Sequence, residues 1–364
     1  MILKNLKVLH IMNKATTGGI PQVVINICQQ EISKSIKFDC TVFDDNFGIS
    51  GKILKQLGCH FYLLPKQSKN PIGFIIKLIY ILKTGKYDII HVHTNHSSWL
   101  PIMVAWFCGI KNRIAHSHTS KKAGIIRQFL STKITPLFAT NLIGCTILAG
   151  QTVFGRNVVD NSKFKLFYNT IDVKNFAFKL SSRINMRHQM KLKGKFVFGC
   201  VGRLDTNKNF IFALDVFHII QKKLNESKLL IIGEGTLRKD LEEKVNKLRL
   251  NKEVIFVGNK KNINDYYQVM DCFLFPSLHE GFGIAAIEAQ CSGLPCFISD
   301  GVPDAAMICN TTKIPLSKSA KQWADIILEK INKFERKDCS DIIKKAGLDI
   351  TNTSNKIEQI YLQK

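Results

Sequence analysis

The sequence predicts an α/β protein built from two Rossmann-like, doubly wound parallel-sheet domains in tandem. The chain has 364 residues, which is too long for one ordinary α/β domain and sufficient for two. Short runs of β-branched and apolar residues alternate with longer amphipathic stretches, which is the order of repeated βα units. Two such sheets would face a cleft, and ligands bind beyond the carboxyl ends of parallel strands.

In the first half of the chain, strand-like runs alternate with helical patterns. The expected strands are residues 6–12, 39–44, 59–64, 87–93 and 112–118. The expected helices are residues 50–57, 71–84 and 97–109, and one that begins at Pro21, where proline is favoured at a first helical position. The alternation becomes indistinct between residues 142 and 195, where only a strand and a turn within 162–176 stand out. A domain boundary is therefore expected near residue 175.

A second series of strand-like runs follows this boundary. It comprises residues 195–202, 228–235, 253–258, 271–276 and 294–299, with helical segments between them. The expected domains are thus residues 1–175 and 176–345, followed by a terminal segment, 346–364.

The chain is strongly basic, with a formal net charge of +24. Residues 1–175 hold 22 Lys and Arg against 7 Asp and Glu, and the remaining residues hold 30 against 21. This excess favours an anionic partner, which the first half is better placed to meet. The alternative is a composition bias without function. A nucleic-acid-binding protein is disfavoured, because no helix-turn-helix, zinc finger or aromatic–basic platform is found.

The cysteines and the apolar stretches indicate a cytoplasmic protein. There are eleven cysteines, an odd number, with no C-x-x-C pair, and most stand in apolar strings, as buried thiols in a reducing compartment do. No signal peptide precedes the first strand-like run. The longest uncharged apolar stretch, residues 99–110, has 12 residues and is too short to span a bilayer. The expected protein is soluble, or peripheral on the inner face of the cell membrane.

A pair of glutamates brackets a glycine-rich turn in SLHEGFGIAAIEAQCSGLP, residues 277–295. Glu280 and Glu288 are eight residues apart, between a buried strand and a helix expected to begin near Gly283. The first N–H groups of such a helix bind phosphate or sugar oxygens, and glycine lets the backbone approach a ligand. Taken singly, the favoured interpretation of Glu280 is a helix-entry carboxylate, and that of Glu288 is a residue on a solvated face. Small and apolar neighbours of Glu288 argue against the solvated alternative, because an isolated buried carboxylate is costly.

Two cations flank the loop in GCVGRLDTNKNF, residues 199–210. Arg203 and Lys208 follow a strand, where they could stabilise the negative charge of a diphosphate leaving group without a metal. The alternative is a pair of ordinary solvated loop residues.

EGFGIAAIEAQCSGLP resembles the E-x7-E signature of retaining glycosyltransferases of the GT-B fold, specifically the family-four group of bacterial polysaccharide and lipid-sugar enzymes. The resemblance implies that Glu280 lies by the donor sugar and that Glu288 holds the nucleotide ribose. It also implies that backbone N–H groups of Gly281, Phe282, Gly283 and Ile284 bind sugar and phosphate. VGRL…KN, about 80 residues earlier, matches the diphosphate clamp of this family, which assigns Arg203 and Lys208 to donor binding.

Two adjacent glycines, Gly18 and Gly19, occur in ATTGGIPQVV after the first strand-like run. The dinucleotide fingerprint G-x-G-x-x-G is absent, and an ordinary βα turn is the alternative. By resemblance, the GG loop of the family borders the donor diphosphate and the acceptor. Many relatives carry a glutamate two residues beyond the equivalent of Ile20, whereas Pro21 and Gln22 stand here, so no role of that acid is carried over.

Histidines gather in HVHTNH and AHSHT, and alternation on a strand would give common faces to His91 with His93 and to His116 with His118. A metal site is one interpretation. Against it, the two groups lie on different strands and no carboxylate or cysteine stands at ligand spacing. By resemblance, one histidine lies near the reacting sugar. His118 matches that position best and is the expected catalytic residue with Glu280, although His116 stays an alternative.

Residues 121–140, KKAGIIRQFLSTKITPLFAT, interleave Lys121, Lys122, Arg127 and Lys133 with apolar residues. Such a segment can lie on an anionic membrane surface. The alternative is a surface helix whose apolar face packs on the domain core.

The resemblance extends beyond the site residues. LIIGEGTLRKDLEEKVNKLRLNKEVIFVG resembles the strand–helix–strand core of the family's second domain, and FYNTID resembles its N-G-I-D turn, with Thr170 in place of glycine. The tail resembles a C-terminal helix that crosses back to the first domain. Residues 1–175 would then be the acceptor domain and 176–345 the donor domain.

The implied reaction is transfer, with retention, of a sugar from a nucleotide-diphosphate sugar to a saccharide or lipid-linked saccharide in cell-surface polysaccharide synthesis. The resemblance favours a UDP-sugar. No D-x-D pair occurs, so no metal is expected, and no cofactor either. Alternatives are a GT-B nucleotide-sugar epimerase, an inactive GT-B scaffold, or a basic nucleic-acid-binding protein. A phosphorylase is not supported, because no pyridoxal-phosphate lysine site is found.

Overall fold

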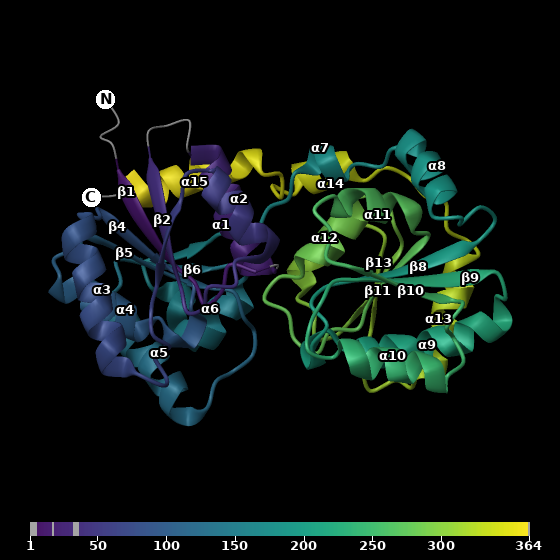
Figure 1. Ribbon diagram of the computed structural model, residues 1–364, viewed down its shortest axis with the longest axis horizontal. Helices are drawn as coiled ribbons and strands as arrows, with labels where there is room; N and C mark the ends of the chain where they lie inside the picture. Colours follow the sequence, from purple (N-terminus) through teal and green to yellow (C-terminus); the bar gives the residue numbers. More distant parts are fainter. Residues whose placement is uncertain (1–5, 17, 32–35, 363–364) are drawn as a thin grey trace. The chain divides into compact units, whose positions relative to one another are not determined.

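A computed structural model describes residues 6–16, 18–31 and 36–362 of the chain (Figure 1). The chain divides into two compact units. Unit 1 is formed by the chain up to Thr170 together with the residues from Ile350 onward, and unit 2 by Ile171–Asp349. The unit boundaries thus follow Thr170 and Asp349, whereas the sequence suggested residues 175 and 345.

Seven parallel strands form the sheet of unit 1, in the order β3-β2-β1-β4-β5-β6-β7. Their bounds are β1 Lys7–Ile11, β2 Lys37–Val42, β3 His60–Leu63, β4 Ile89–Val92, β5 Asn112–Ser117, β6 Asn141–Gly144 and β7 Phe164–Leu166. The five strands predicted for the first half are confirmed, and β7 is the strand expected within 162–176. Strand β6 was not predicted, because only two residues separate it from the apolar helix α6, so that the two elements look like one apolar run.

Helices cover both faces of this sheet (Figure 1). Helices α3, α4, α5 and α6 pack side by side in that order on one face, and α2, α1 and α15 pack in that order on the other. Their bounds are α1 Gly19–Glu31, α2 Gly48–Gln56, α3 Pro71–Gly85, α4 Trp99–Phe107, α5 Ile125–Phe138, α6 Ile147–Phe154 and α15 Thr351–Leu362. One core lies between the sheet and the α3–α6 layer, where side chains such as Phe74, Leu78 and Ile102 are fully buried. Helix α1 begins at Gly19, two residues before the predicted Pro21.

The last helix, α15, returns to unit 1 and packs against α1. Its Tyr361 hydroxyl lies 2.9 Å from His91 Nδ1, and its Ile360 carbonyl accepts a hydrogen bond from Asn112 Nδ2 at 3.0 Å. Near its start, the Thr353 hydroxyl lies 2.6 Å from that of Thr170. These buried polar contacts fix both ends of α15 on the unit.

Six parallel strands form the sheet of unit 2, in the order β10-β9-β8-β11-β12-β13. The bounds are β8 Phe196–Val201, β9 Ser227–Ile232, β10 Val254–Gly258, β11 Cys272–Phe275, β12 Cys296–Ser299 and β13 Thr311–Ile314. All five strands predicted for the second half are confirmed, and β13 is an additional edge strand. The helices are α7 Val173–Phe176, α8 Leu180–Gln189, α9 Phe210–Lys223, α10 Arg238–Lys247, α11 Ile263–Val269, α12 Ile284–Cys291, α13 Ala320–Ile331 and α14 Ser340–Lys345.

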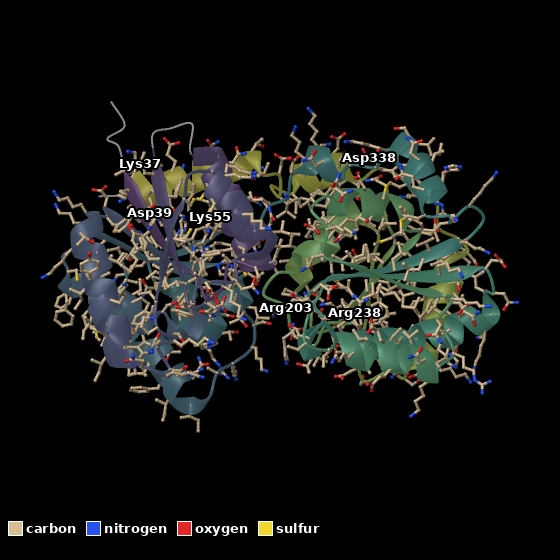
Figure 2. All side chains as sticks on the ribbon, in the orientation of Figure 1. Lys37, Asp39, Lys55, Arg203, Arg238 and Asp338 are labelled. Carbon is tan, nitrogen blue, oxygen red and sulfur yellow. The ribbon has the colours of Figure 1, made fainter. Side chains whose placement is uncertain are left out.

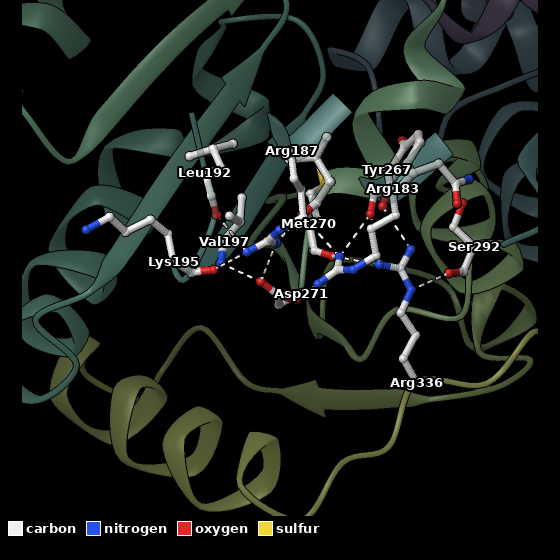
Figure 3. A network of polar contacts seen from close by, with 12 residues as sticks. Arg183, Arg187, Leu192, Lys195, Val197, Tyr267, Met270, Asp271, Ser292 and Arg336 are labelled. Atoms are coloured by element: carbon white, nitrogen blue, oxygen red, sulfur yellow. Dashed lines mark hydrogen bonds and ion pairs between the residues drawn. The ribbon is translucent and has the colours of Figure 1, made fainter. Parts of the chain in front are cut away.

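An arginine network holds the start of β11 (Figure 3). Asp271, directly before this strand, receives Arg183 and Arg187 from α8, and its Oδ2 also accepts a hydrogen bond from Val197 N at 2.8 Å. Arg336 donates to the Met270 carbonyl at 2.7 Å. Burial and the neighbouring Arg183 lower the pKa of Arg336 to about 9. A strand that leads to the E-x7-E segment is therefore anchored by charge as well as by pairing.

Candidate active site

Four loops of unit 2 meet at the carboxyl edge of its sheet, because the strands that carry them are neighbours in the order β9-β8-β11-β12. Their mutual contacts are close. Leu278 N donates to the Asn207 carbonyl at 2.8 Å, and Asn207 Nδ2 donates to the His279 carbonyl at 2.7 Å. A Cβ at Gly233 would lie only 1.9 Å from the Gly202 carbonyl oxygen, so the loop after β9 requires glycine there. The loops that carry both predicted motifs are thus joined.

Lys208 and Glu280 form an ion pair at this edge. Lys208 Nζ lies 2.6 Å from Glu280 Oε1, and their side chains are only 17% and 12% exposed. The ammonium group also lies 4.7 Å from the centre of the Phe275 ring. The sequence assigned both residues to one site, and unit 2 brings them together. Their ion pair was not expected from the sequence. A partly buried cation held by one carboxylate keeps hydrogen-bond donors for an anionic ligand.

Arg203 lies on the loop after β8 (Figure 2), where its Nε donates to Asp205 Oδ2 at 2.6 Å. Its side chain is 62% exposed. The other oxygen of Asp205 accepts from Lys208 N at 3.2 Å and caps the short 3₁₀ turn Thr206–Lys208. Asp205 therefore sets the shape of the loop from which both cations project.

Glu288 lies one turn into α12 and is partly buried. Its Oε2 accepts a hydrogen bond from the Tyr267 hydroxyl at 2.7 Å. Burial raises the pKa of Glu288 to about 7, and the Tyr267 hydrogen bond and Lys208 oppose that rise. Burial, together with the Glu288 charge, also raises the pKa of Tyr267. The alternative of a fully solvated Glu288 is wrong. Its carboxylate is a partly buried hydrogen-bond acceptor that the Tyr267 hydroxyl holds in place.

Helix α12 begins at Ile284, as predicted, with Gly283 at its N-cap. Gly283 has a φ of 93°, a left-handed conformation that glycine adopts without strain. It supplies no capping side chain, so the first turn keeps its positive dipole end open to an anion. Phe282 is buried, and Glu280 N donates to the Gly301 carbonyl at 2.9 Å, which holds the Gly281 turn in place.

Five histidines form a layer in unit 1, of which four are buried and His118 is partly exposed. His10, His91 and His116 lie on the neighbouring strands β1, β4 and β5. His93 directly follows β4, and His118 directly follows β5. His10 Nδ1 lies 3.0 Å from His93 Nε2, and His93 Nδ1 lies 2.9 Å from His118 Nε2. A second pair joins His91 Nε2 to His116 Nδ1 at 3.2 Å. Burial lowers the pKa of all five, that of His118 to about 3, so the imidazoles are neutral near pH 7.

His91 and His116 lie on different strands, but, contrary to the expectation from the sequence, the strands do not keep them apart. Strands β4 and β5 are paired, and β1 adds His10 on the other side of β4. Among the described residues, two trios have nitrogens near enough to hold a metal ion, namely His10–His91–His93 and His93–His116–His118. The hydrogen bonds within the layer already use most of these nitrogens. His116 is fully buried, whereas His118 is partly exposed and can meet a ligand.

His118 is held by its backbone as well as by its ring. Its N–H donates to Asn95 Oδ1 at 2.7 Å, and Asn95 takes a left-handed φ of 53°. The glycines of the first loop lie elsewhere along the sheet edge of unit 1. Gly18 has a φ of 150°, and its carbonyl accepts from Gln22 N at 3.2 Å, next to the start of α1.

Sequence reasoning missed Tyr267, Asp205, Asn95 and His10. Tyr267 stands 21 residues before its partner Glu288, at a spacing that carries no periodic signal. His10 stands 83 residues from His93, and only the strand order brings them together. Asp205, by contrast, precedes its 3₁₀ turn as a capping residue does, and the motif itself gave that signal.

Comparison with known proteins finds glycosyltransferases that are similar to this chain. Residues 182–347, most of unit 2, match the family model of "Glycosyl transferases group 1". The capsular polysaccharide biosynthesis glycosyltransferase CapH of Staphylococcus aureus is 25% identical over 373 residues, which cover 99% of each chain. The UDP-Gal:alpha-D-GlcNAc-diphosphoundecaprenol alpha-1,3-galactosyltransferase of Escherichia coli is 26% identical over 310 residues, covering 81% of this chain and 79% of that protein.

The crystal structure of Anabaena HepE in complex with UDP and glucose has the same fold. Its TM-score is 0.82 at 18% identity, over 97% of this chain and 98% of that chain. This likeness and the two parallel-sheet units confirm the predicted two-domain GT-B fold. The chain is therefore a glycosyltransferase with a GT-B fold, most of its unit 2 matches glycosyltransferase group 1, and its homologues include proteins of bacterial capsular polysaccharide biosynthesis.

Proposed function

We propose that this chain transfers a sugar, with retention of its anomeric configuration, from a UDP-sugar to a saccharide or lipid-linked saccharide in cell-surface polysaccharide synthesis. The observation that carries the proposal is the joined set of groups at the carboxyl edge of unit 2. It comprises an acceptor carboxylate, Glu288, a shielded cation, Lys208, and an open helix start at Gly283.

The nucleoside end of the donor is assigned to Glu288. A ribose offers two hydroxyl donors, and an ionised carboxylate held by Tyr267 offers acceptors. Because Tyr267 occupies one lone pair of Oε2, the other oxygen is available to the ribose. The uridine base is supported by the name of the Escherichia coli relative, which uses UDP-Gal.

The diphosphate is assigned to Arg203, Lys208 and the backbone of Gly281–Ile284. The leaving UDP gains negative charge as the glycosidic bond breaks, and preorganised donors stabilise that charge most where water is excluded. Lys208 is suited to this role, since its side chain is largely shielded. Glu280, its partner, is assigned to the hydroxyls of the donor sugar.

Unit 1 is assigned to the acceptor. His118 is the proposed residue near the reacting sugar, and Gly18 and Gly19 the proposed close backbone approach. We propose departure of the diphosphate assisting attack of the acceptor on the same face of the sugar, since no carboxylate nucleophile is evident. The proposed reaction uses no metal or other cofactor, so activity in EDTA should equal that in Mg²⁺. A cytoplasmic location with peripheral contact at the inner membrane face completes the proposal.

The test is a screen of UDP-sugars by calorimetry, with wild type, Glu288→Gln and a control, Glu329→Gln, which changes an exposed carboxylate of α13. One donor should bind wild type and the control and bind Glu288→Gln at least about tenfold more weakly, the effect of losing a charged hydrogen bond. Transfer to a lipid-linked saccharide, with the product anomer read by NMR, tests retention. An inverted product would overturn the mechanism. Conversion of the donor to an epimer, without transfer, would favour the epimerase, and no donor binding would favour an inactive scaffold.

A further inference from the structure

Half of the histidines of the chain gather in one place. The chain has 10 histidines, and five of them form the layer on and after β1, β4 and β5, which are neighbouring strands of unit 1 (Figure 1). The rings lie close together, and the centres of the His116 and His118 rings are 4.0 Å apart. The proposed function assigns a role to His118 alone. Four buried polar rings are therefore left without one, although burying a polar group is unfavourable unless it is fully paired.

The layer contains buried nitrogens that lack a hydrogen-bond partner. Among the described residues, His116 Nε2 and His118 Nδ1 are buried and have none. His116 is fully buried as a residue, whereas His118 is partly exposed. An unpaired buried nitrogen in a folded protein requires an explanation, and a bound ion is one that would satisfy it.

One trio of the layer has both the spacing and the access that a metal ion requires. His93, His116 and His118 present nitrogens that all lie within 4.8 Å of one another. His118 connects this trio with solvent, because it is partly exposed. The other trio, His10–His91–His93, consists of fully buried residues only. The trio that includes His118 is therefore the one that an ion can enter.

The rest of the layer supplies the outer contacts of such a site. A histidine ligand normally donates its second N–H to an acceptor, which fixes its tautomer and the direction of its ring. His93 Nε2 lies 3.0 Å from His10 Nδ1, and His116 Nδ1 lies 3.2 Å from His91 Nε2. If these N–H groups are donated inwards, the lone pairs stand on His93 Nδ1 and His116 Nε2. His10 and His91 are thus placed to orient two ligands.

The third nitrogen is His118 Nε2, which lies 2.9 Å from His93 Nδ1. The hydrogen bond between these two atoms uses one proton, and an ion that takes its place binds both lone pairs. The proton of His118 then stands on Nδ1. Every ring keeps one proton, so binding requires a change of tautomer but no loss of a proton. The backbone of His118 is held independently, since its N–H donates to Asn95 Oδ1 at 2.7 Å.

We propose that His93, His116 and His118 bind a transition-metal ion of the Zn²⁺ type, which withdraws the His118 ring from the reaction. Three imidazoles suit Zn²⁺, with a water as fourth ligand, whereas Mg²⁺ and Ca²⁺ require oxygen ligands. All members of this trio are histidines. Because the proposed reaction needs no metal, the ion acts as an inhibitor. The inhibition rests on the proposed function, in which His118 lies near the reacting sugar, but the metal binding does not.

Binding is tested by calorimetric titration of the metal-free full chain with Zn²⁺. The test variant is His116→Asn, which keeps an amide N–H for His91 and removes the ligand Nε2. The matched control is His96→Asn, since His96 is another buried histidine of unit 1, 8% exposed, outside both trios. Wild type and the control should bind one Zn²⁺ per chain. The test variant should bind it at least about 100-fold more weakly, because loss of an outer partner alone weakens binding about 10- to 100-fold.

A measurement on wild type needs no variant to fold. In ¹⁵N NMR, Zn²⁺ should shift the imidazole signals of His93, His116 and His118 and leave that of His96 unchanged. Equal Zn²⁺ affinity of wild type and His116→Asn would overturn the metal site. So would shifts confined to exposed histidines such as His188, which would show surface binding only.

Inhibition is measured as the rate of transfer with Zn²⁺ relative to the metal-free rate of the same variant. Zn²⁺ should lower the rate of wild type and His96→Asn about 10²-fold, the usual effect of removing one preorganised donor, and EDTA should restore it. His116→Asn should keep its metal-free rate at the same Zn²⁺ concentration. Bound Zn²⁺ without loss of transfer would overturn the effect on His118. UDP-sugar binding in EDTA tests the donor site alone, so its failure would refute the proposed function and leave the metal site standing.

Discussion

His93 Nδ1 lies 2.9 Å from His118 Nε2, while the other nitrogen of His93 lies 3.0 Å from His10 Nδ1. Three neutral rings hold three N–H groups and share two hydrogen bonds, so one N–H must point outward at an end. It stands either on His10 Nε2 or on His118 Nδ1, and neither of these nitrogens has a partner among the described residues. The donor or acceptor role of His118 is thus coupled to the tautomer of His10.

Replacing His10 by Phe should change the tautomer of His118 and leave its neutral charge state unchanged. The reason is that His93 would lose the partner of its Nε2, and one direction of the chain of hydrogen bonds would no longer be favoured over the other. ¹⁵N NMR of the imidazoles reports tautomers directly. Identical His118 spectra in wild type and His10→Phe would refute the coupling.

The imidazole of His118 should stay neutral from pH 8 down to about pH 5, because burial lowers its pKa to about 3. NMR titration of the folded chain would show no His118 shift in this interval, while the same residue in urea-unfolded chain would titrate. Titration of folded His118 near pH 6.5 would contradict the buried layer.

Nucleotide binding should strengthen as the pH rises through 7. The pKa of Glu288 is raised to about 7, and only its ionised form accepts two ribose hydrogen bonds. Calorimetry of UDP binding between pH 6 and 8 would show this for wild type. Glu288→Gln, which does not ionise, should bind weakly with a flat profile through that midpoint. The midpoint should move further upward in Tyr267→Phe, because the hydroxyl that stabilises the carboxylate is lost.

The same shift has a consequence for stability with the opposite sign. The unfolded carboxyl ionises near pH 4.5 and the folded one near 7, so folding favours the protonated form. The free energy of unfolding should therefore fall as the pH rises from about 4.5 to about 7. The loss is at most about 3 kcal/mol, at 1.36 kcal/mol per pH unit. Urea unfolding of Glu288→Gln should lack this component of the pH dependence, and a wild-type curve parallel to that of the variant would count against the buried carboxylate.

Lys208→Met should lower the rate of transfer about 10²- to 10³-fold, the usual effect of removing one preorganised charge donor. It should also destabilise the chain, because the Glu280 side chain, which is only 12% exposed, would lose the cation that pairs with it. The matched control is Lys223→Met, which breaks an ion pair of similar length, 2.7 Å, whose side chains are 54% and 46% exposed. That variant should keep full activity and a stability close to that of wild type. Equal effects of the two substitutions would exclude a special role for Lys208.

Asp271→Asn should destabilise unit 2 by about 3–5 kcal/mol, since Arg183 and Arg187 would be left without their carboxylate. Chemical denaturation followed by circular dichroism measures the loss. The exposed pair Lys195–Glu226 gives the comparison, and Glu226→Gln should leave the stability close to that of wild type. Asp271→Asn with wild-type stability would mean that backbone carbonyls alone satisfy these arginines.

Much of the fold could be predicted from the sequence, because ten strands are apolar runs set apart by turn residues or helical segments. Strand β6 is followed after two residues by the apolar helix α6, and β13 is only partly buried, so neither stands out from its surroundings. The start of α12 could also be predicted, because glycine before an apolar helical run has a specific backbone reason.

The site could be predicted only where its residues share one segment. Glu280 and Glu288 stand on either side of one turn, but Tyr267 reaches Glu288 from a separate helix, α11. The pairing of Lys208 with Glu280 depends on β8 and β11 being neighbours, an order that no local pattern encodes. For the same reason, the histidines of β4 and β5 were wrongly judged to be apart.

The return of α15 to unit 1 has a consequence for biosynthesis. Unit 2 is one contiguous segment, Ile171–Asp349, whereas unit 1 needs residues from both sides of it. While the ribosome is still translating α15, His91 lacks the Tyr361 hydroxyl and Asn112 lacks its carbonyl partners. The unit that is synthesised first is therefore the last to be completed, and during that interval the nascent chain exposes the side of the sheet that α15 later covers to chaperones and proteases.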